Sequence, residues 1–252
     1  MVRCGAGLLS ALVLACACAG DGAEAPVELT VFAASSLIEA FEGMRSAFAE
    51  HHPDTDVTFN FAGSQRLAAQ IAQGAPADVF ASASGAQMDA VVEAGLAEGQ
   101  PRPFAGNRLQ IAVEPGNPKG IATLRDLAAA DVKLVLGALQ VPAGRYAAEA
   151  LEAAGVDVEP VSLETDVRQV LSKVALGEAD AGIVYVTDVT GAGAQVEGVP
   201  IPAEDNVPVT YPIVALAEAP NPGMAADWVD FVLSDRGQSI LADHGFSEPW
   251  VP

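Results

Sequence analysis

Short apolar runs alternate with amphipathic segments along most of the chain. Leu37, Phe41, Met44 and Phe48 recur at spacings of four, three and four, which places them on one face of a helix. Seven runs have the length and composition of strands: residues 27–33, 56–61, 77–82, 108–113, 133–137, 181–186 and 210–216. This alternation predicts an α/β fold with largely parallel sheets.

The first residues form a leader rather than part of the fold. Arg3 precedes a short apolar run from Leu8 to Ala15, and small residues and cysteine follow, as in a secretory leader. The run is too short to span a bilayer, which takes about 20 residues. We expect residues 1–18 to be a signal or lipoprotein leader and residues 19–26 a tether. The body is then exported, to the periplasm or the cell surface.

All three cysteines, Cys4, Cys16 and Cys18, lie in this leader, so we expect no disulfide or thiolate metal site in the body. The segment VLAC, which ends at Cys16, resembles a bacterial lipobox, whose cysteine is lipidated. We therefore predict lipidation at Cys16, with Cys18 as the alternative and simple cleavage of the leader as the other interpretation. Membrane contact would then be made only through the lipid anchor.

The chain is strongly acidic. Its net charge is −21, from 12 basic and 33 acidic residues, and loss of the leader removes Arg3 and leaves −22. Such a protein repels nucleic acid and anionic membrane surfaces, so we expect no nucleic-acid partner. It also repels a small anion unless local groups overcome the global field.

Four strand-to-helix turns share one design. The first holds Ser35 and Ser36, and the others lead into helices near Ser64, at Pro142–Gly144 and at Thr165–Val167. Each helix start offers free backbone N–H groups and roughly half a positive charge. A single turn of this kind is an ordinary cap, but a ligand in an α/β fold binds at the carboxyl ends of strands, where helices begin.

Several motifs occur together and in order, and they cover the chain from Leu29 to Phe246. They are VFAASSL, FAGSQRLAAQIAQGAPADVFASA, GNRLQIAVEP, VPAGRYAAEAL, AGIVYVTD, TYPIVAL and the closing HGF. With them the chain resembles the periplasmic molybdate-binding proteins, the solute receptors of molybdate ABC importers. The resemblance implies a two-lobed α/β fold of the type II periplasmic-binding-protein class, with mixed sheets flanked by helices and the ligand in the cleft between the lobes.

The division into lobes follows from the same resemblance. We expect one discontinuous lobe from residues 27–106 and 209–252, and a second lobe from residues 107–208. Three Pro- and Gly-rich stretches are candidate crossings between the lobes: residues 99–107, 114–120 and 201–208.

In that family the oxyanion is held by neutral hydrogen-bond donors. Carried onto this sequence, the donors are the hydroxyls and amides of Ser36 and Ser64, the amides of Ala143 and Val167, and the phenol of Tyr185. Ala143 and Val167 rest on the resemblance, although both lie at predicted helix starts. The family further implies a receptor without enzymatic activity or cofactor, a monomer that delivers molybdate, and with it tungstate, to a membrane permease. No side chain would ligate the metal directly.

Three neighbours of these residues receive no role in ligand binding. Ser35 is predicted to shape or cap the turn behind Ser36. Gly63 stands where many members of the family have hydroxyl residues, and Arg66 follows two residues after Ser64. We expect Arg66 to point outward from the first helical turn.

A site built only from donors has a definite selectivity. Molybdate, tungstate and sulfate accept every hydrogen bond that is offered. Monohydrogen phosphate carries an O–H, and without an acceptor that group stays unpaired at a cost of about 1–3 kcal/mol. Cavity size must then separate molybdate from sulfate.

Other functions fit the sequence less well. A serine hydrolase would need a histidine, and His51, His52 and His244 all stand at predicted helix ends, while no G-x-S-x-G motif occurs. A receptor for sulfate, ferric ion or an organic solute stays open. A receptor for ferric ion would need clustered tyrosines and carboxylates as ligands, whereas the three tyrosines of this protein are dispersed along the sequence.

Overall fold

The computed structural model describes Met1 and residues 26–250. The predicted leader, both lipidation candidates, Cys16 and Cys18, and most of the predicted tether lie outside the described residues. None of the helices in the described part of the chain is long and apolar enough to cross a membrane.

The first sheet has the strand order β2-β1-β3-β10-β4. Its strands are β1 (Val27–Ala34), β2 (Thr55–Ala62), β3 (Val79–Ala81), β4 (Arg102–Asn107) and β10 (Val209–Ala215). β1 is parallel to both β2 and β3, whereas β10 is antiparallel to β3 and β4. The sheet is therefore mixed, with its parallel half formed by the first three strands of the chain.

The second sheet has the order β7-β6-β8-β5-β9. Its strands are β5 (Leu109–Val113), β6 (Leu134–Gly137), β7 (Ser162–Glu164), β8 (Ala181–Tyr185) and β9 (Glu197–Pro200). β6 is parallel to β7 and β8, and β5 is antiparallel to β8 and β9. Both sheets are thus mixed, which confirms the predicted α/β class with mixed sheets. The expectation of largely parallel sheets was wrong, because four strand pairings are parallel and four are antiparallel.

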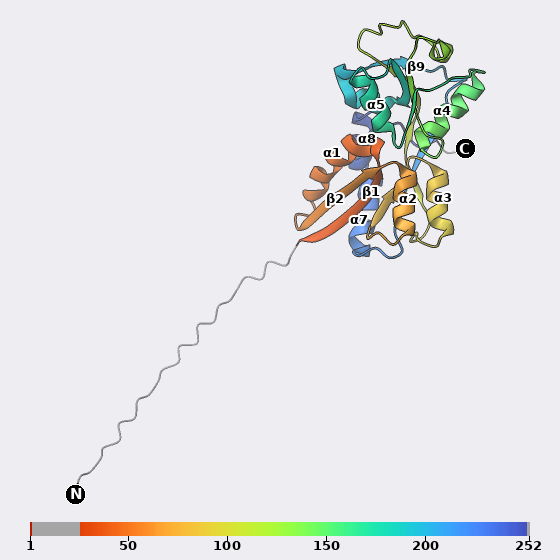
Figure 1. The fold of residues 1–252 in the computed structure, drawn as a ribbon. Helices are drawn as coiled ribbons and strands as arrows, with labels where there is room; N and C mark the ends of the chain where they lie inside the picture. Colours follow the sequence, from red (N-terminus) through yellow and green to blue (C-terminus); the bar gives the residue numbers. More distant parts are fainter. Residues whose placement is uncertain (2–25, 251–252) are drawn as a thin grey trace.

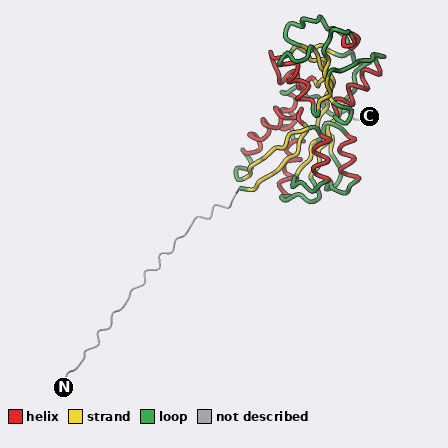
Figure 2. The backbone as a smooth tube through the Cα atoms, in the orientation of Figure 1, coloured by secondary structure: helices red, strands yellow, loops and turns green. Residues whose placement is uncertain are grey.

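Helices flank the strands in two lobes, one above the other in Figures 1 and 2. The α-helices are α1 (Ile38–Ala49), α2 (Ser64–Ala72), α3 (Gly85–Glu93), α4 (Pro142–Ala153), α5 (Val167–Ala175), α6 (Val186–Ala192), α7 (Pro222–Leu233) and α8 (Asp235–Asp243). Three short 3-10 turns are η1 (Ser35–Leu37), η2 (Leu124–Ala128) and η3 (Gly193–Gln195). In Figure 1, α1, α2, α3 and α7 accompany the strands of the first sheet, and α4 and α5 those of the second.

The apolar stripe predicted for the first helix is buried in the core. Leu37, Phe41, Met44 and Phe48 are all fully buried, and the rings of Phe41 and Phe48 meet the edge of Trp228 from α7. The ring of Phe41 also packs against Phe59 of β2, so these contacts hold α1 against α7 and the first sheet and set the position of the turn that precedes the helix.

The chain passes between the sheets twice, at Arg108 between β4 and β5 and through residues 201–208 between β9 and β10. Two of the candidate crossings were wrong. Residues 102–107 of the first stretch form β4, an edge strand where proline is tolerated because one side of the strand is unpaired. Residues 114–120 join β5 to η2, and the next strand, β6, lies in the same sheet as β5.

Candidate functional site

The five predicted ligand residues come together around one small cavity. Ser36, Ser64, Ala143, Val167 and Tyr185 all line it, and each is almost completely buried. Its volume is about 10 Å³, close to the minimum for a single water molecule. The two sheets contribute to it jointly, so it lies between the lobes.

Each residue stands where a strand ends and a helix or turn begins. Ser64 and Val167 are the first residues of α2 and α5, and Ala143 is the second residue of α4. Backbone N–H groups at these positions have no intrahelical acceptor, and the aligned peptide dipoles add about half a positive charge to each helix end. Three helices thus direct free donors and positive potential at the cavity.

The first turn differs from the prediction. Ser36 lies in η1, and α1 begins two residues later, at Ile38. The Ser35 carbonyl accepts a hydrogen bond from the Ile38 amide, while neither serine hydroxyl caps the turn. Of the two predicted roles of Ser35, shaping or capping the turn, the structure shows the first, through the backbone of Ser35.

The three hydroxyls predicted to bind the ligand differ in their hydrogen bonding: two have partners among the described residues and one has none. Ser36 Oγ lies 2.9 Å from Tyr211 Oη, and Ser64 Oγ accepts a hydrogen bond of 3.0 Å from the Ala83 amide. Tyr185 Oη is buried and has no hydrogen-bond partner among the described residues. An unpaired buried hydroxyl is costly, so a group beside a cavity in this state is suited to meet a ligand.

Burial keeps the phenols neutral. It raises the pKa of Tyr185 well above its ordinary value, and the nearby Tyr211 and Tyr146 act in the same direction. The pKa of Tyr211 is raised as well, again chiefly by burial. Both groups are therefore protonated at neutral pH, and Tyr185 can donate its hydrogen to an anion.

Cations near the cavity are either remote or neutralised. Arg66 is exposed, as expected. Arg168, next to Val167, forms a 2.8 Å ion pair with Glu39 of α1, and its second nitrogen lies 3.8 Å from Asp188. The pair joins the two lobes beside the cavity without adding a free positive charge to it.

A second contact joins the two lobes, between the first turn of α2 and the residues that precede α5. The Gln65 side-chain amide, in α2, donates a 2.8 Å hydrogen bond to the Thr165 carbonyl, which precedes α5. A Cβ on Gly63 would overlap this carbonyl, so a residue with a side chain would hold the two turns apart. The glycine that departs from the family pattern therefore permits this close approach.

Sequence reasoning missed the residues behind the cavity. Tyr211 comes from β10, yet its ring lies 6.0 Å from that of Tyr185, so tyrosines that are dispersed along the chain are neighbours in space. Asn107, at the end of β4, donates to Tyr211 Oη over 3.3 Å. Both residues stand within motifs noted above, but only the pairing of distant strands brings them to the site.

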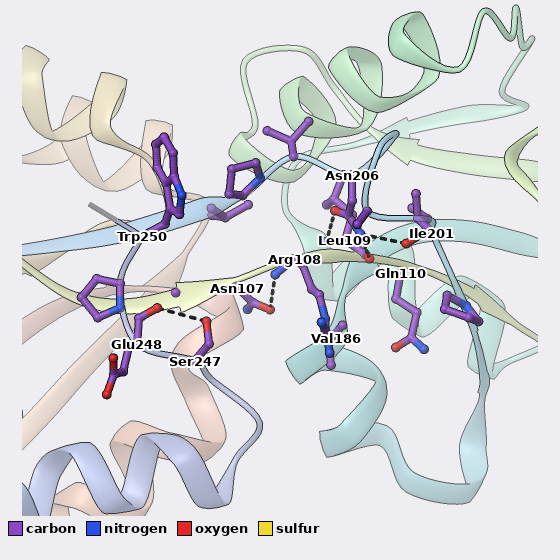
Figure 3. Close-up of a pocket in the computed structure, with 17 residues that line it drawn as sticks. Asn107, Arg108, Leu109, Gln110, Val186, Ile201, Asn206, Ser247, Glu248 and Trp250 are labelled. Atoms are coloured by element: carbon purple, nitrogen blue, oxygen red, sulfur yellow. Dashed lines mark hydrogen bonds between the residues drawn. The ribbon is translucent and has the colours of Figure 1, made fainter. Parts of the chain in front are cut away.

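A larger cavity of about 710 Å³ lies where the chain crosses between the lobes (Figure 3). Arg108 and Glu248 supply its charges, Trp250 forms part of its wall, and none of the predicted ligand residues lines it. The cavity is broad and carries both signs of charge, unlike the donor-lined space described above. Within residues 26–250, no group of three or more His, Cys, Asp or Glu side chains could hold a metal ion.

Asp188 should give the protein an unusual dependence of stability on pH. Burial raises the pKa of its carboxyl from the ordinary 3.8 to about 7, although hydrogen bonding from the Tyr185 amide and the charge of Arg168 oppose the rise. Between these two values the folded protein holds a proton that the unfolded chain has released. The contribution of this carboxyl to the free energy of unfolding therefore falls as pH rises from about 4 to about 7.

Asp188→Asn should remove this dependence of the free energy of unfolding on pH, whose slope reaches up to about 1.4 kcal/mol per pH unit. Thermal unfolding of both proteins across this range should show the variant gaining stability relative to wild type as pH rises. Asp126→Asn is the control, because hydrogen bonds lower the pKa of that partly exposed carboxyl and place its titration below the range. A constant difference between Asp188→Asn and wild type would contradict the assignment.

The comparisons with known proteins agree with this geometry. Residues 29–247 match the family model described as bacterial extracellular solute-binding protein. The chain is 40% identical to the molybdate-binding protein ModA of Mycobacterium tuberculosis, over 96% of this chain and 97% of that one. In fold it is similar to the periplasmic molybdate-binding protein of Azotobacter vinelandii, with a TM-score of 0.78, 22% identity and coverage of 88% and 100% of the two chains.

A similar likeness exists to the sulfate-binding protein SubI of Mycobacterium tuberculosis, with a TM-score of 0.77, 18% identity and coverage of 88% of this chain and 87% of that one. The fold alone therefore does not distinguish these two anions. The family match spans almost all of the described residues and confirms the prediction of a binding protein rather than an enzyme. The chain belongs to the bacterial extracellular solute-binding protein family.

Proposed function

We propose that this protein captures molybdate outside the cytoplasm and delivers it to the membrane permease of an ABC importer. The observation that carries the proposal is the cavity between the lobes, where Tyr185 Oη is buried without a partner among the described residues, beside free amides at three helix starts. The likeness to the mycobacterial molybdate-binding protein supports molybdate as the ligand.

The proposed donors are the five predicted residues. The amides of Ser36, Ser64, Ala143 and Val167 and the hydroxyls of both serines and Tyr185 would share the oxygens of one tetrahedral dianion. A hydrogen bond to a charged group contributes about 1.5–3 kcal/mol, and a helix end adds about 0.3–1 kcal/mol. Several such contacts offset desolvation and the repulsion from a net charge of −22, which is screened beyond about 8–10 Å.

Selectivity among oxyanions would follow from donors and size. A site without an acceptor disfavours monohydrogen phosphate, whose O–H would stay unpaired. Sulfate has the charge and shape of molybdate but is smaller, so its oxygens would not reach all of the donors at once. Tungstate is nearly identical to molybdate, and we expect both to bind.

Closure of the lobes would couple binding to transport. The Glu39–Arg168 ion pair and the Gln65–Thr165 hydrogen bond both join the lobes beside the cavity. An ion that draws the helix ends together would favour these contacts and so stabilise the closed form, which the permease can distinguish from the open form. We expect the receptor to act as a monomer, with lobe boundaries near residues 107 and 209.

The N-terminus would attach the receptor to the membrane. We propose that Cys16, or else Cys18, carries a lipid after the leader is removed. The described fold begins close to this point, at β1, so a short tether would join it to the bilayer.

Calorimetry and thermal unfolding with molybdate, tungstate, sulfate and phosphate test the proposal directly. Molybdate and tungstate should bind with one ion per chain and raise the melting temperature, since a ligand at 100 times its Kd adds about 2.7 kcal/mol to the free energy of unfolding. Sulfate should bind more weakly and phosphate most weakly. Binding of sulfate as tight as that of molybdate would contradict size selection, and no stabilisation by any oxyanion would overturn the receptor assignment.

A further inference from the structure

A chain of hydrogen bonds runs from the crossing between the lobes to the cavity. It begins at the Arg108 amide, which donates to Asn107 Oδ1 over 2.9 Å (Figure 3). A backbone N–H can only donate, so this contact identifies the Asn107 oxygen and fixes the orientation of the side-chain amide. The Asn107 nitrogen must then face the other way, with two hydrogens to give.

Both of those hydrogens have acceptors. Asn107 Nδ2 donates to Thr187 Oγ1 over 2.9 Å and to Tyr211 Oη over 3.3 Å. Because Asn107 Nδ2 donates to Tyr211 Oη, the Tyr211 hydrogen points away from Asn107, and the other hydrogen-bond partner of Tyr211 Oη among the described residues is Ser36 Oγ, at 2.9 Å. Tyr211 is fully buried and Asn107 is 7% exposed, so solvent does not compete for these groups.

We propose that Asn107 and Tyr211 are positioning residues that fix the Ser36 hydroxyl as a donor toward the bound anion. The inference rests on the proposed function and deepens it, since it names what makes the site reject protonated oxyanions. Ser36 Oγ accepts from Tyr211 on its far side, and its own hydrogen is left for the cavity. Discrimination against protonated oxyanions then needs no carboxylate in the site, because the residues behind Ser36 determine that its hydroxyl donates toward the anion.

Ser64 is oriented in the same way by a different group. Its Oγ accepts from the Ala83 amide over 3.0 Å, and a backbone amide cannot reverse its role. The hydrogen of Ser64 is therefore also free for the cavity. The orientation of the Ser36 hydroxyl is less firmly fixed than that of Ser64, because its partner is itself a hydroxyl. Without the hydrogen bond from Asn107, Tyr211 Oη could either donate to Ser36 or accept from it.

The consequence appears in the comparison of two anions of similar size. Monohydrogen phosphate and sulfate both carry two negative charges at mildly alkaline pH, but only phosphate carries a hydrogen. With Ser36 Oγ already accepting from Tyr211 and donating to the anion, accepting that hydrogen would require a third hydrogen bond at the same hydroxyl. If the Tyr211 hydroxyl is removed, Ser36 Oγ is free to accept, and the penalty on phosphate falls.

The test is the ratio of the phosphate to the sulfate dissociation constant in wild type and in Tyr211→Phe. Both constants are measured by calorimetric displacement of molybdate, at mildly alkaline pH. Wild type should bind sulfate more tightly than phosphate, and Tyr211→Phe should lower the ratio by about fivefold to a hundredfold. Asn107→Ala should lower it in the same direction, because Tyr211 no longer has to donate to Ser36.

Tyr146→Phe is the matched control. It removes another phenolic hydroxyl, on α4, and should leave the ratio unchanged. An unchanged ratio in folded Tyr211→Phe, or equal binding of the two anions by wild type, overturns the inference. If Tyr211→Phe does not fold, Asn107→Ala decides by the same criterion. Failure of the proposed function is seen separately, as an absence of molybdate binding by wild type.

Discussion

Tyr185→Phe should weaken molybdate binding by about tenfold to a hundredfold without destabilising the unliganded protein. A hydrogen bond to a charged group contributes about 1.5–3 kcal/mol, and the variant loses one such bond to the anion. The hydroxyl has no hydrogen-bond partner among the described residues and is fully buried, so its removal breaks no hydrogen bond within that part of the protein. The variant should unfold at the same temperature as wild type or at a higher one.

This combination separates a ligand contact from a structural one. Calorimetry gives the affinity for molybdate, and thermal unfolding without ligand gives the stability. A hydroxyl with a structural role would lower the melting temperature when removed, whereas one that serves the anion lowers the affinity alone. Equal affinities of Tyr185→Phe and wild type would remove Tyr185 from the site.

Gly144→Ala should have a comparably large effect through the backbone. A Cβ at this position would overlap the carbonyl oxygens of Gly137 and Ala138, at the end of β6. The start of α4 would have to move away from the strand, and with it the Ala143 amide that is proposed to donate to the anion. We expect a loss of about 1–3 kcal/mol in stability, and molybdate binding at least tenfold weaker.

Gly223→Ala provides a matched control. Gly223 also follows a proline in the first turn of its helix, α7, but a Cβ added there would meet no atom of the described residues within 4 Å, apart from its chain neighbours and the backbone of its own helix. Alanine at this position should be neutral or stabilising by up to about 1 kcal/mol. Denaturant unfolding and molybdate calorimetry on both variants give the answer. If Gly144→Ala behaves as Gly223→Ala does, the close packing of α4 on β6 is not required for binding.

Whether a strand could be predicted from the sequence depends on whether it lies in the interior or at the edge of its sheet. All seven apolar runs became strands, and six of them are interior. The missed strands, β4, β7 and β9, are edge strands of three to six residues. An edge strand buries less apolar surface and tolerates proline and charge, so its sequence lacks the continuous hydrophobic run that reveals an interior strand.

The candidate site divides in a similar way. Helix starts at Ser64, Pro142 and Val167 could be read from local patterns, because a helix N-terminus has local signals. The 3-10 turn at Ser36 carries no such signal. The contact between Ser36 and Tyr211 joins residues 175 positions apart, and only the pairing of β10 with β3 and β4 creates it. Local sequence thus indicates the donors but not the groups that orient them.

The position of β10 has a consequence for the order in which the molecule can fold. β10 lies between β3 and β4, although the whole second sheet separates it from β4 along the chain. The second sheet comes from one continuous segment, so its strands can pair as soon as that segment has been synthesised. The first sheet can be completed only with residues 209–215, because β4 joins it through β10, and such non-local pairing is slow. Tyr211 arrives with this strand, so the buried layer behind the cavity is completed among the last parts of the fold.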